Sequence, residues 1–541
     1  MRKITNILSP LLEMYRYKDK KDPFKIFEQM KKENSLKRDK KKGNVLVLPL
    51  RVSPTSNTFE GVLSYALKYK GYDVYSLMCG QMLTKCDHVN QKQPFSLACS
   101  LCLKEQEKFT SAYETISYTY DNMIESSEYN KILTIVKETK LEDIFSYKYK
   151  DVSIGKYVEG GVARFLLMSN IDLKKNEKLI REYFFTALTT AEATINILKK
   201  VKPKFVVMSH GIYSTWGTAL EVCKTLGFHS IVWGRGYVGK GNIVASHNNS
   251  YLFDTIYEPT DLWENNIISE ENKAKITDYF SKKRNPESNV DYVNYYKNVG
   301  ENKEDIFALL NIKKERKRIG VYPNIPWDGK MFSATKEFPD LNTFVKVLLE
   351  WAEKNQKVDI IIRAHPAEAY QKGNETMETF FDILSQECSE LPQNIIYIEP
   401  TSSINSYQVS EICDVALMYA STLALEFAYM KHPVIQVGLN NVSNKGLVFD
   451  APTKKIMYDF LDKALNGSLK VDEDMHKKIV KYSDYWLNKR HIPEELLYLK
   501  KLTFDGYTFK DIDSLVNSEF KVLEWFIKCC ETKALFIWNS N

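Results

Sequence analysis

The sequence contains no run of about 18 consecutive apolar residues, which is the length that a membrane-spanning helix needs. Its first segment, MRKITNILSPLLEMYRYKDKK, is interrupted by Asn6, Ser9, Pro10 and Glu13 and so lacks the continuous apolar core of a signal peptide. Internal repeats are also missing. The nine cysteines are an odd number in a chain of 541 residues, unlike the disulfide framework of a secreted protein. These absences predict a cytoplasmic protein, either free or peripheral to the inner face of the membrane.

Most of the chain has no excess of positive or negative charge. Residues 1–42 hold 14 Lys and Arg against 6 Asp and Glu, a net +8, so the other 499 residues carry −2 of the total of +6. We therefore predict a basic N-terminal helical arm, residues 1–43, that is either solvated or in contact with an anionic membrane surface. Few aromatic residues lie among its cations and no nucleic-acid module follows it, so a nucleic-acid partner is not expected.

The composition is that of an ordinary globular protein, with 44% hydrophobic and 27% charged residues, which excludes the disordered and collagen-like classes. Short buried strands alternate with helical patterns in two sets, which is typical of doubly wound α/β domains. The strands expected in the first set are 44–50, 73–78, 204–210 and 229–235, and those in the second are 318–324, 358–366, 394–400, 414–420 and 433–438.

The two strand sets divide the chain into domains. We predict an N-terminal Rossmann-like domain over 44–315, with a helical insertion at about 106–200 and a linker at about 260–315 where the chain is polar and weakly patterned. A C-terminal Rossmann-like domain over 316–470 and a helical extension over 471–541 follow.

A histidine and a proline follow the second strand of the second set. In open parallel sheets, ligands bind outside the carboxyl ends of the strands, so His365 stands where a ligand is expected. Pro366 ends the strand and fixes the loop behind it. An imidazole at this place can donate a hydrogen bond to a phosphate oxygen and stabilise a departing nucleoside phosphate.

Two hydroxyl groups and a carboxylate follow the fourth strand of this set. Ser421 and Thr422 stand at a helix start, where they can cap the helix and leave its free N–H groups facing an anion. Glu426 lies four residues after Thr422 on the same helical face and can accept hydrogen bonds from a ribose or sugar hydroxyl. The alternatives are simple N-capping for the hydroxyls and a solvated helix position for Glu426.

In this order, the motifs resemble the nucleotide-sugar half of GT-B glycosyltransferases. More narrowly, they are similar to the capsule-polysaccharide biosynthesis transferases with an HP motif, whose relatives include Kdo transferases and bacterial sialyltransferases that use CMP-sugars. The likeness covers residues 318–450 best, with 204–240 in addition. The matching residues are Arg363-Ala364-His365-Pro366-Ala367-Glu368, Tyr419-Ala420-Ser421-Thr422, Glu426 and Lys431-His432-Pro433-Val434-Ile435.

The resemblance implies two Rossmann-like domains that face a cleft, with the donor on the second and the acceptor on the first. His365 is then the contact to the donor phosphate, and Glu426 the contact to the ribose or donor sugar. Asn324 is either a contact to donor or acceptor or an ordinary turn residue ahead of Pro326. Lys431 and His432 replace the small residue and glycine that many GT-B enzymes have here. The donor-binding residues that the resemblance implicates are Arg363, His365, Pro366, Ser421, Thr422 and Glu426.

An inverting transfer needs a base for the acceptor hydroxyl, and the first domain offers two candidates. Glu60 follows the first strand near a helix start, where the helix dipole favours an ionised carboxylate. It also stands where the HP-motif transferases have an acidic residue followed by glycine, so the resemblance nominates it. His210 at another strand tip, ahead of Gly211, is the rival, as a base or as an acceptor contact.

Four cysteines after the second strand suggest a metal. Cys79, Cys86, Cys99 and Cys102 lie within 24 residues and include one CxxC pair, so they are candidate ligands of a structural zinc ion. Buried free thiols are the alternative. Asp511-Ile512-Asp513 imitates a metal-binding DxD motif but follows no predicted strand, so we expect catalysis without a metal cofactor.

These features predict a glycosyltransferase that moves a sugar from a nucleotide-activated donor, with a CMP-sugar favoured, to a surface or capsular glycan or a lipid-linked glycan. The transfer is expected to be metal-independent and inverting. Three alternatives remain open: a CDP-glycerol-type polyol phosphotransferase, a non-hydrolysing sugar-nucleotide 2-epimerase, and a non-catalytic scaffold that binds glycan.

Overall fold

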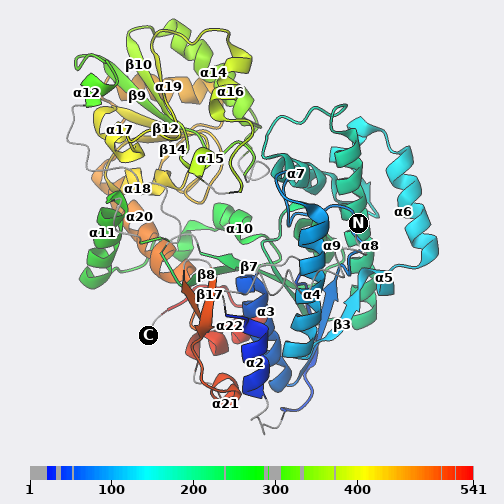
Figure 1. Ribbon diagram of the computed structural model, residues 1–541. Coiled ribbons are helices and arrows are strands. Elements are labelled where there is room, and N and C mark those ends of the chain that lie inside the picture. The colour runs from blue at the N-terminus through cyan, green and yellow to red at the C-terminus, as the bar shows by residue number, and fades with distance from the viewer. Residues whose placement is uncertain are drawn as a thin grey trace. The chain divides into compact units, whose positions relative to one another are not determined.

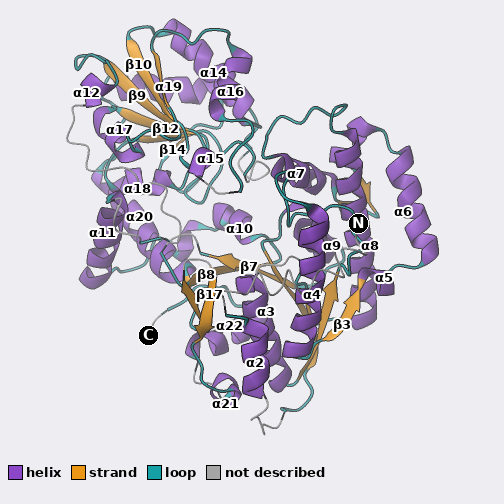
Figure 2. Ribbon diagram, in the orientation of Figure 1, coloured by secondary structure: helices purple, strands orange, loops and turns teal. Residues whose placement is uncertain are grey.

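A computed structural model describes residues 21–31, 38–50, 54–236, 239–285, 290–291, 306–328, 334–370, 373–500, 503–517 and 520–539. The chain forms two compact units (Figures 1 and 2). Unit 1 comprises Met1–Phe165, Ile171–Tyr251 and Arg490–Asn541, and unit 2 comprises Leu166–Asn170 and Leu252–Lys489. The boundary at Tyr251 differs from the predicted boundary at 315, because the stretch from 252 onward folds with the second sheet.

Unit 1 is built on a seven-stranded sheet, and β1 (Gly43–Val47) is the middle one of its five parallel strands. The chain adds β2 (Tyr72–Met78) and β3 (Ile116–Thr119) on one side of β1, then β6 (Phe205–Ser209) and β7 (Ser230–Arg235) on the other, all parallel. This is the Rossmann order of strands. β8 (Asn242–His247) and β15 (Ile492–Pro493) continue the sheet in antiparallel orientation.

Most other elements of unit 1 are helices that cover this sheet. The apolar residues of the central strands are buried, as expected for parallel strands with both faces covered. The helices are α2 (Pro23–Lys31), α3 (Pro54–Tyr69), α4 (Phe95–Tyr113), α5 (Tyr120–Met123), α6 (Ser126–Glu138), α7 (Gly155–Leu166), α8 (Glu177–Val201), α9 (Thr218–Thr225), α21 (Ile512–Val516) and α22 (Lys521–Thr532). The shorter elements are β4 (Lys148–Tyr149), β5 (Val152–Ser153), β16 (Leu497–Lys500), β17 (Thr503–Tyr507), the 3-10 helix Leu141–Ser146 and the π-helix Tyr213–Gly217.

The described part of the basic arm is packed into unit 1 and is not a solvated helix. Phe24 and Phe27 of α2 are buried, and the Phe27 ring lies 4.8 Å from the Tyr113 ring. Several cations pair with acidic residues of the same unit, including Lys31 with Glu114, Arg38 with Asp73 and Lys42 with Glu531. Residues 1–20 and 32–37 of the arm lie outside the described residues, and its contact with a membrane stays a prediction.

Two predicted helical regions also contribute strands. β3 lies inside the expected insertion at 106–200, and its mostly half-buried residues form the edge of the sheet, where the hydrophobic pattern is weak. The expected helical extension at 471–541 contains β15 to β17, and it divides between the units at Lys489. Asp511 caps α21 by accepting a hydrogen bond from Ser514 N at 2.8 Å. Within the part of the chain that the structure describes, no helix is both long and apolar enough to cross a membrane.

Unit 2 contains a six-stranded parallel sheet with the order β11-β10-β9-β12-β13-β14. The chain enters at β9 (Lys317–Tyr322), adds β10 (Val358–Arg363) and β11 (Ile395–Ile398) on one side, and returns to the other side. There it adds β12 (Val415–Met418), β13 (Val434–Gln436) and β14 (Phe449–Asp450). This is again the Rossmann order, and all five strands predicted for this set are confirmed.

The predicted linker is largely an ordered part of unit 2. α11 (Glu270–Arg284) buries Ile276 and Phe280, and Ser269 caps its first turn by accepting from Asn272 N. The other helices of unit 2 are α12 (Ile306–Leu309), α14 (Leu341–Lys354), α15 (Ala367–Tyr370), α16 (Phe380–Glu387), α17 (Ser406–Ile412), α18 (Leu423–Tyr429), α19 (Lys454–Leu465) and α20 (Glu473–Asp484). α10 (Tyr251–Tyr257) begins at the boundary, and the 3-10 helix Thr260–Leu262 and the π-helix Tyr485–Arg490 complete the set.

Candidate functional site

The strand order of unit 2 reverses between β9 and β12. Ligands of doubly wound sheets bind outside the carboxyl ends of the strands at such a switch point. β9 and β12 end level with each other, since Tyr322 pairs with Met418, and β10 is in register with β9 through Ile362 and Val321. The loops that follow these three strands carry Asn324, Ser421 and His365, so the structure brings these three of the predicted residues to the switch point.

His365 is held as a neutral imidazole with a defined tautomer. Its Nδ1 accepts a hydrogen bond from Ala367 N at 3.1 Å, so the proton resides on Nε2. Burial lowers the pKa of His365 to about 4, and the nearby Arg363 guanidinium contributes in the same direction. The ring at this strand end is therefore a hydrogen-bond donor through Nε2 at neutral pH. Pro366 follows as predicted, and its carbonyl starts α15 by accepting from Ala369 N and Tyr370 N.

Arg363 supports this loop from beneath. Its side chain is 2% exposed. The guanidinium donates to the main-chain carbonyls of Ile404 at 2.8 Å, Ala364 at 2.6 Å and Glu399 at 2.9 Å. Because its donors are used inside the protein, Arg363 fixes the loops after β10 and β11, and the structure does not aim it at a ligand as the resemblance implies.

The two hydroxyl residues after β12, Ser421 and Thr422, differ in their contacts. Ser421 Oγ accepts from Leu423 N at 3.3 Å, while Thr422 is exposed and makes no capping bond. Asn440, in the loop after β13, donates from Nδ2 to Ser421 O at 2.8 Å. Asn324 is half-buried, and its Oδ1 accepts from Ile325 N at 2.8 Å. Short polar side chains from the loops after three strands therefore stand beside the switch point.

Glu426 is engaged inside unit 2 and is not a solvated helix residue. It is 4% exposed, and its Oε1 forms an ion pair with Lys283 Nζ of α11 at 2.8 Å. Its other oxygen accepts from the Tyr407 hydroxyl. Lys283 also lies 3.3 Å from Asp291, and the carboxylates raise the pKa of the ammonium well above its usual range against the opposing effect of burial. This pairing competes with the predicted ribose contact.

The motif Lys431-His432-Pro433 forms a tight turn into β13. Lys431 adopts φ = 58°, a left-handed conformation that a glycine adopts without strain. Its side chain is exposed and pairs with Glu473. Lys431 therefore adopts the backbone conformation that a glycine would favour at this turn, while its side chain points to the surface.

Unit 1 has its own switch point, between β1 and β6, and His210 follows β6 there. His210 adopts φ = 59° at the centre of a three-residue turn in which Gly211 N donates to Ser209 O at 2.7 Å. Such a turn is strained for a side chain other than glycine and marks a candidate functional position. The ring stacks on Trp216 with centroids 5.0 Å apart, and Trp216 Nε1 donates to Leu48 O after β1.

Glu60 is a buried acid, contrary to the prediction of an ionised carboxylate at a helix start. α3 begins at Pro54, so Glu60 lies beyond the first turn and gains little from the helix dipole. It is 1% exposed, its Oε1 accepts from Trp233 Nε1 at 3.1 Å, and its Oε2 has no hydrogen-bond partner. Burial raises the pKa of Glu60 to about 8, although the Trp233 bond acts in the opposite direction. The carboxyl group is mostly protonated at neutral pH.

The pKa of Glu60 predicts how stability changes with pH. The folded pKa of about 8 lies above the ordinary value of 4.5, so the folded protein keeps a proton that the unfolded chain releases between these values. The stabilisation is complete below pH 4.5 and is lost as the pH rises through 8, in total about 5 kcal/mol. In Glu60→Gln the side chain stays neutral at every pH.

We therefore expect Glu60→Gln to match the wild type in thermal unfolding near pH 4.5 and to exceed it above pH 8. Glu107→Gln, at an exposed side chain of the same unit, is the control and is expected to follow the wild type. A Tm difference that does not grow with pH would contradict the buried neutral acid.

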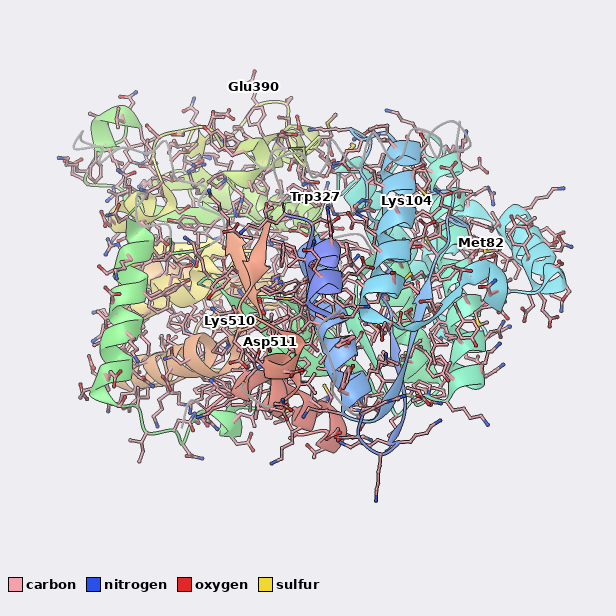
Figure 3. The ribbon with its side chains drawn as sticks, turned by 60° about the horizontal axis from the view of Figure 1, so that its bottom comes forward. Met82, Lys104, Trp327, Glu390, Lys510 and Asp511 are labelled. Atoms are coloured by element: carbon pink, nitrogen blue, oxygen red, sulfur yellow. The ribbon has the colours of Figure 1, made fainter. Side chains whose placement is uncertain are left out.

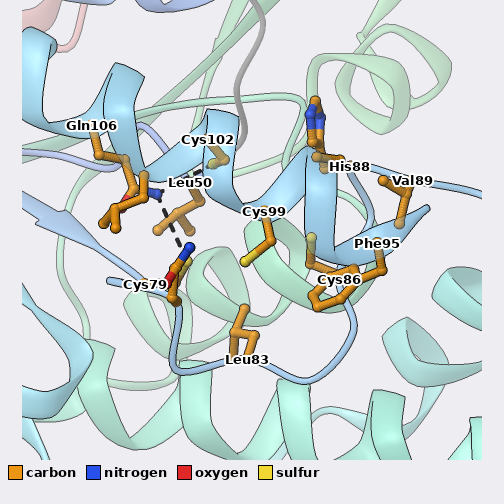
Figure 4. Close-up of a pocket in the computed structure, with 13 residues that line it drawn as sticks. Leu50, Cys79, Leu83, Cys86, His88, Val89, Phe95, Cys99, Cys102 and Gln106 are labelled. Atoms are coloured by element: carbon orange, nitrogen blue, oxygen red, sulfur yellow. Dashed lines mark hydrogen bonds between the residues drawn. The ribbon is translucent and has the colours of Figure 1, made fainter. Parts of the chain in front are cut away.

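All four predicted zinc ligands line one small cavity at the carboxyl end of β2 (Figure 4). Gln106 Nε2 lies 3.7 Å from Cys79 Sγ and 3.5 Å from Cys102 Sγ, and most of the other lining side chains are apolar. Burial raises the pKa of the Cys86 and Cys102 thiols, which favours their protonated forms. Among the residues that the structure describes, no three His, Cys, Asp or Glu side chains are arranged to hold a metal ion. The cysteines, including Cys99, come together in a thiol-lined cavity and not in a metal-ligand set.

Comparisons with known proteins concern the fold. No protein-family model and no curated protein matches the sequence. The KpsC β-Kdo 2,4-transferase of Thermosulfurimonas dismutans is 12% identical over 52% of this chain and 87% of its own, with a TM-score of 0.32. The UDP-GlcNAc 2-epimerase of Neisseria meningitidis, solved with UDP-GlcNAc, is 9% identical over 90% of this chain and 100% of its own, with a TM-score of 0.28. A glycosyltransferase of Rickettsia africae is 11% identical over 90% of this chain and 99% of its own, with a TM-score of 0.25.

The structure itself shows two units in one chain, each with a sheet of Rossmann strand order. The predicted α/β class with two Rossmann-like domains is confirmed in this respect. The side chains at the two switch points carry the evidence on function.

Sequence reasoning missed the partners that control these side chains. Lys283 lies in a stretch that looks like a linker, and Tyr407 lies in a helix without a motif, so neither signals a contact with Glu426. Asn440 had a detectable signal, because it follows the predicted strand 433–438 at its carboxyl end. Trp233 also had a detectable signal, since an indole N–H in a buried strand needs a hydrogen-bond acceptor. Glu60 provides that acceptor.

Proposed function

We propose that the protein is a glycosyltransferase that moves a sugar from a nucleotide-activated donor to a glycan acceptor. One observation carries this proposal: at the switch point of unit 2, a neutral imidazole donor and short polar side chains follow adjacent parallel strands. Such a place binds nucleotides in Rossmann-ordered sheets. The donor belongs to unit 2, and the acceptor belongs to the switch point of unit 1 with His210.

His365 provides the chemistry for the departing phosphate. Its Nε2–H donates to a phosphate oxygen, and the interaction strengthens as negative charge develops on the nucleoside phosphate. A neutral donor held by Ala367 N performs this role without a change of protonation between pH 5 and 8. A CMP-sugar is the favoured donor, on the likeness of the His-Pro and Ser-Thr motifs to transferases that use CMP-sugars.

Glu60 is the proposed base. The acceptor hydroxyl oxygen attacks the anomeric carbon, the bond from that carbon to the nucleoside phosphate breaks, and Glu60 takes the hydroxyl proton through Oε2. Attack opposite the leaving group inverts the anomeric centre. A base works best when its pKa lies near the working pH, and burial gives Glu60 a pKa of about 8. Trp233 orients the carboxylate through Oε1.

We further propose that the transfer needs no divalent cation, because the Nε2–H of His365 can stabilise the charge of the departing phosphate. Addition of EDTA is then expected to leave turnover unchanged. The acceptor is proposed to be a surface or capsular glycan, on the same likeness as the donor.

A binding screen tests the proposal. CMP, CDP, UDP, GDP and TDP are added singly to the wild type and to His365→Ala, and thermal unfolding is followed, since a ligand that binds only the folded state raises Tm. His432→Ala is the matched control, because this half-buried histidine follows α18 and is not part of the switch point. We expect one nucleotide to raise the Tm of the wild type and the control, but not that of His365→Ala.

Other outcomes select other functions. Equal shifts in the wild type and His365→Ala would contradict the donor site, and no shift with any nucleotide would favour the scaffold interpretation. If CDP binds and the product with a glycan acceptor contains a polyol phosphate, the protein is a CDP-glycerol-type phosphotransferase. Turnover of a nucleotide sugar without an acceptor would identify an epimerase.

A further inference from the structure

A short segment of the chain leaves its sequence neighbours and joins the other unit. Residues Leu166–Asn170 comprise the last residue of α7 and the start of its connection to α8, and the rest of α7 and all of α8 belong to unit 1. The segment itself belongs to unit 2. We call these five residues the strap, and their contacts within unit 2 show what they do there.

One buried carboxylate holds the strap. Glu378 is 2% exposed. Its Oε2 accepts from Ser169 N at 2.8 Å, Ser169 Oγ at 3.0 Å and Asn170 N at 2.9 Å, and its Oε1 accepts from Asn170 Nδ2 at 2.7 Å. Hydrogen bonds to a carboxylate are stronger than those between neutral groups, so this cluster fixes the strap firmly.

The centre of the strap adopts a conformation that needs such support. Leu167 has φ = 57°, which is unfavourable for a leucine and persists only where the surroundings impose it. Its side chain is fully buried in a small cluster with Ile325, Trp327 and Ala367. Met377 N, beside Glu378, donates to Leu167 O at 3.0 Å.

The side chains that Leu167 contacts come from two loops of the donor switch point. Ile325 and Trp327 follow Asn324 in the loop after β9 (Trp327 is labelled in Figure 3). Ala367 begins α15 directly after the loop that follows β10, and its N–H is the group that fixes the tautomer of His365. The segment that carries Glu378 is tied to the same loop, because Phe380 N donates to Glu368 Oε2 and Thr376 N donates to Glu368 O.

We propose that the strap and Glu378 are positioning elements of the donor site, which hold the His365 loop in its nucleotide-binding conformation. Leu167 supports the loop from one side, and Glu378 keeps Leu167 in place. The effect on donor binding rests on the proposed function, whereas the effect on the state of His365 does not.

The test compares Glu378→Ala with Glu390→Ala, a control at an exposed glutamate of the same unit whose side chain projects from the surface (Figure 3). Imidazole NMR signals are followed from pH 4 to 8, and the signal of His365 is assigned by its absence in His365→Ala. In the wild type and the control we expect a neutral ring with its proton on Nε2 at least down to pH 5. In Glu378→Ala we expect a midpoint nearer the ordinary value of 6.5 and a mixture of tautomers.

Donor affinity provides the second readout. The nucleotide that binds the wild type is expected to bind Glu378→Ala at least ten-fold more weakly and Glu390→Ala equally well. An unchanged His365 titration in a folded Glu378→Ala protein overturns the inference. If Glu378→Ala does not fold, Asn170→Ala, which removes one hydrogen bond to Oε1, is expected to shift the titration in the same direction, and an unchanged titration there overturns it. If no nucleotide binds the wild type, the proposed function fails while the titration still decides the role of the strap.

Discussion

Glu60→Gln is expected to lower turnover by about 10²- to 10⁴-fold, the usual contribution of a general base. The amide keeps the shape of the acid and the hydrogen bond from Trp233 Nε1, but it cannot take the acceptor proton. In the wild type, kcat/KM is expected to rise with pH through about 8, because the carboxyl group must lose its proton before it acts. The variant is expected to lose this rise.

The same experiment distinguishes the two candidate bases of unit 1. His210→Gln keeps a polar side chain of similar size at the strained turn after β6. We expect this variant to raise KM for the acceptor, with a smaller effect on kcat. If Glu60→Gln keeps the turnover of the wild type and His210→Gln loses it, the base is His210. Glu107→Gln serves as the control for the loss of one carboxylate in unit 1.

Lys283→Met is expected to destabilise unit 2 by about 3 kcal/mol, because it leaves the buried Glu426 carboxylate without its cation. The double variant Lys283→Met with Glu426→Met is expected to recover most of this loss, since a buried ion pair and an apolar pair of similar size differ little in stability. Lys282→Met, at an exposed position on the same helix, is expected to change stability by less than about 0.5 kcal/mol. Denaturant unfolding of the four proteins measures these differences.

This series also decides the role of Glu426. If the ion pair with Lys283 is its function, donor affinity falls in proportion to the loss of stability and recovers in the double variant. If the double variant regains stability but not donor affinity, the result would support the ribose contact of Glu426 that the sequence suggested.

The strands and their carboxyl ends were predictable, because buried parallel strands appear in the sequence as short apolar runs bounded by turn residues. All the strand runs read from the sequence correspond to strands, and His365 and His210 lie at the ends where they were expected. β3 was missed since an edge strand such as Ile116–Thr119 buries little apolar surface.

The environment of each site residue was not predictable to the same degree. Glu60 was expected to be ionised from its place near a helix start, but its burial against Trp233 decides its pKa, and burial by distant strands has no local signal. Glu426 was expected to face solvent or a ligand, but Lys283, 143 positions earlier, pairs with it. The strap illustrates the same limit: Leu166–Asn170 reads as a connection between helices, and its membership in unit 2 depends on a long-range contact with Glu378.

The central claim is that a nucleotide binds at the switch point of unit 2, and hydrogen exchange with and without saturating nucleotide tests it most directly. With the nucleotide selected by the screen, we predict slower exchange in the peptides that cover 323–328, 364–370 and 419–423, and no such protection in His365→Ala. Protection confined to the peptide 209–217 of unit 1, or equal protection in His365→Ala, would contradict the account.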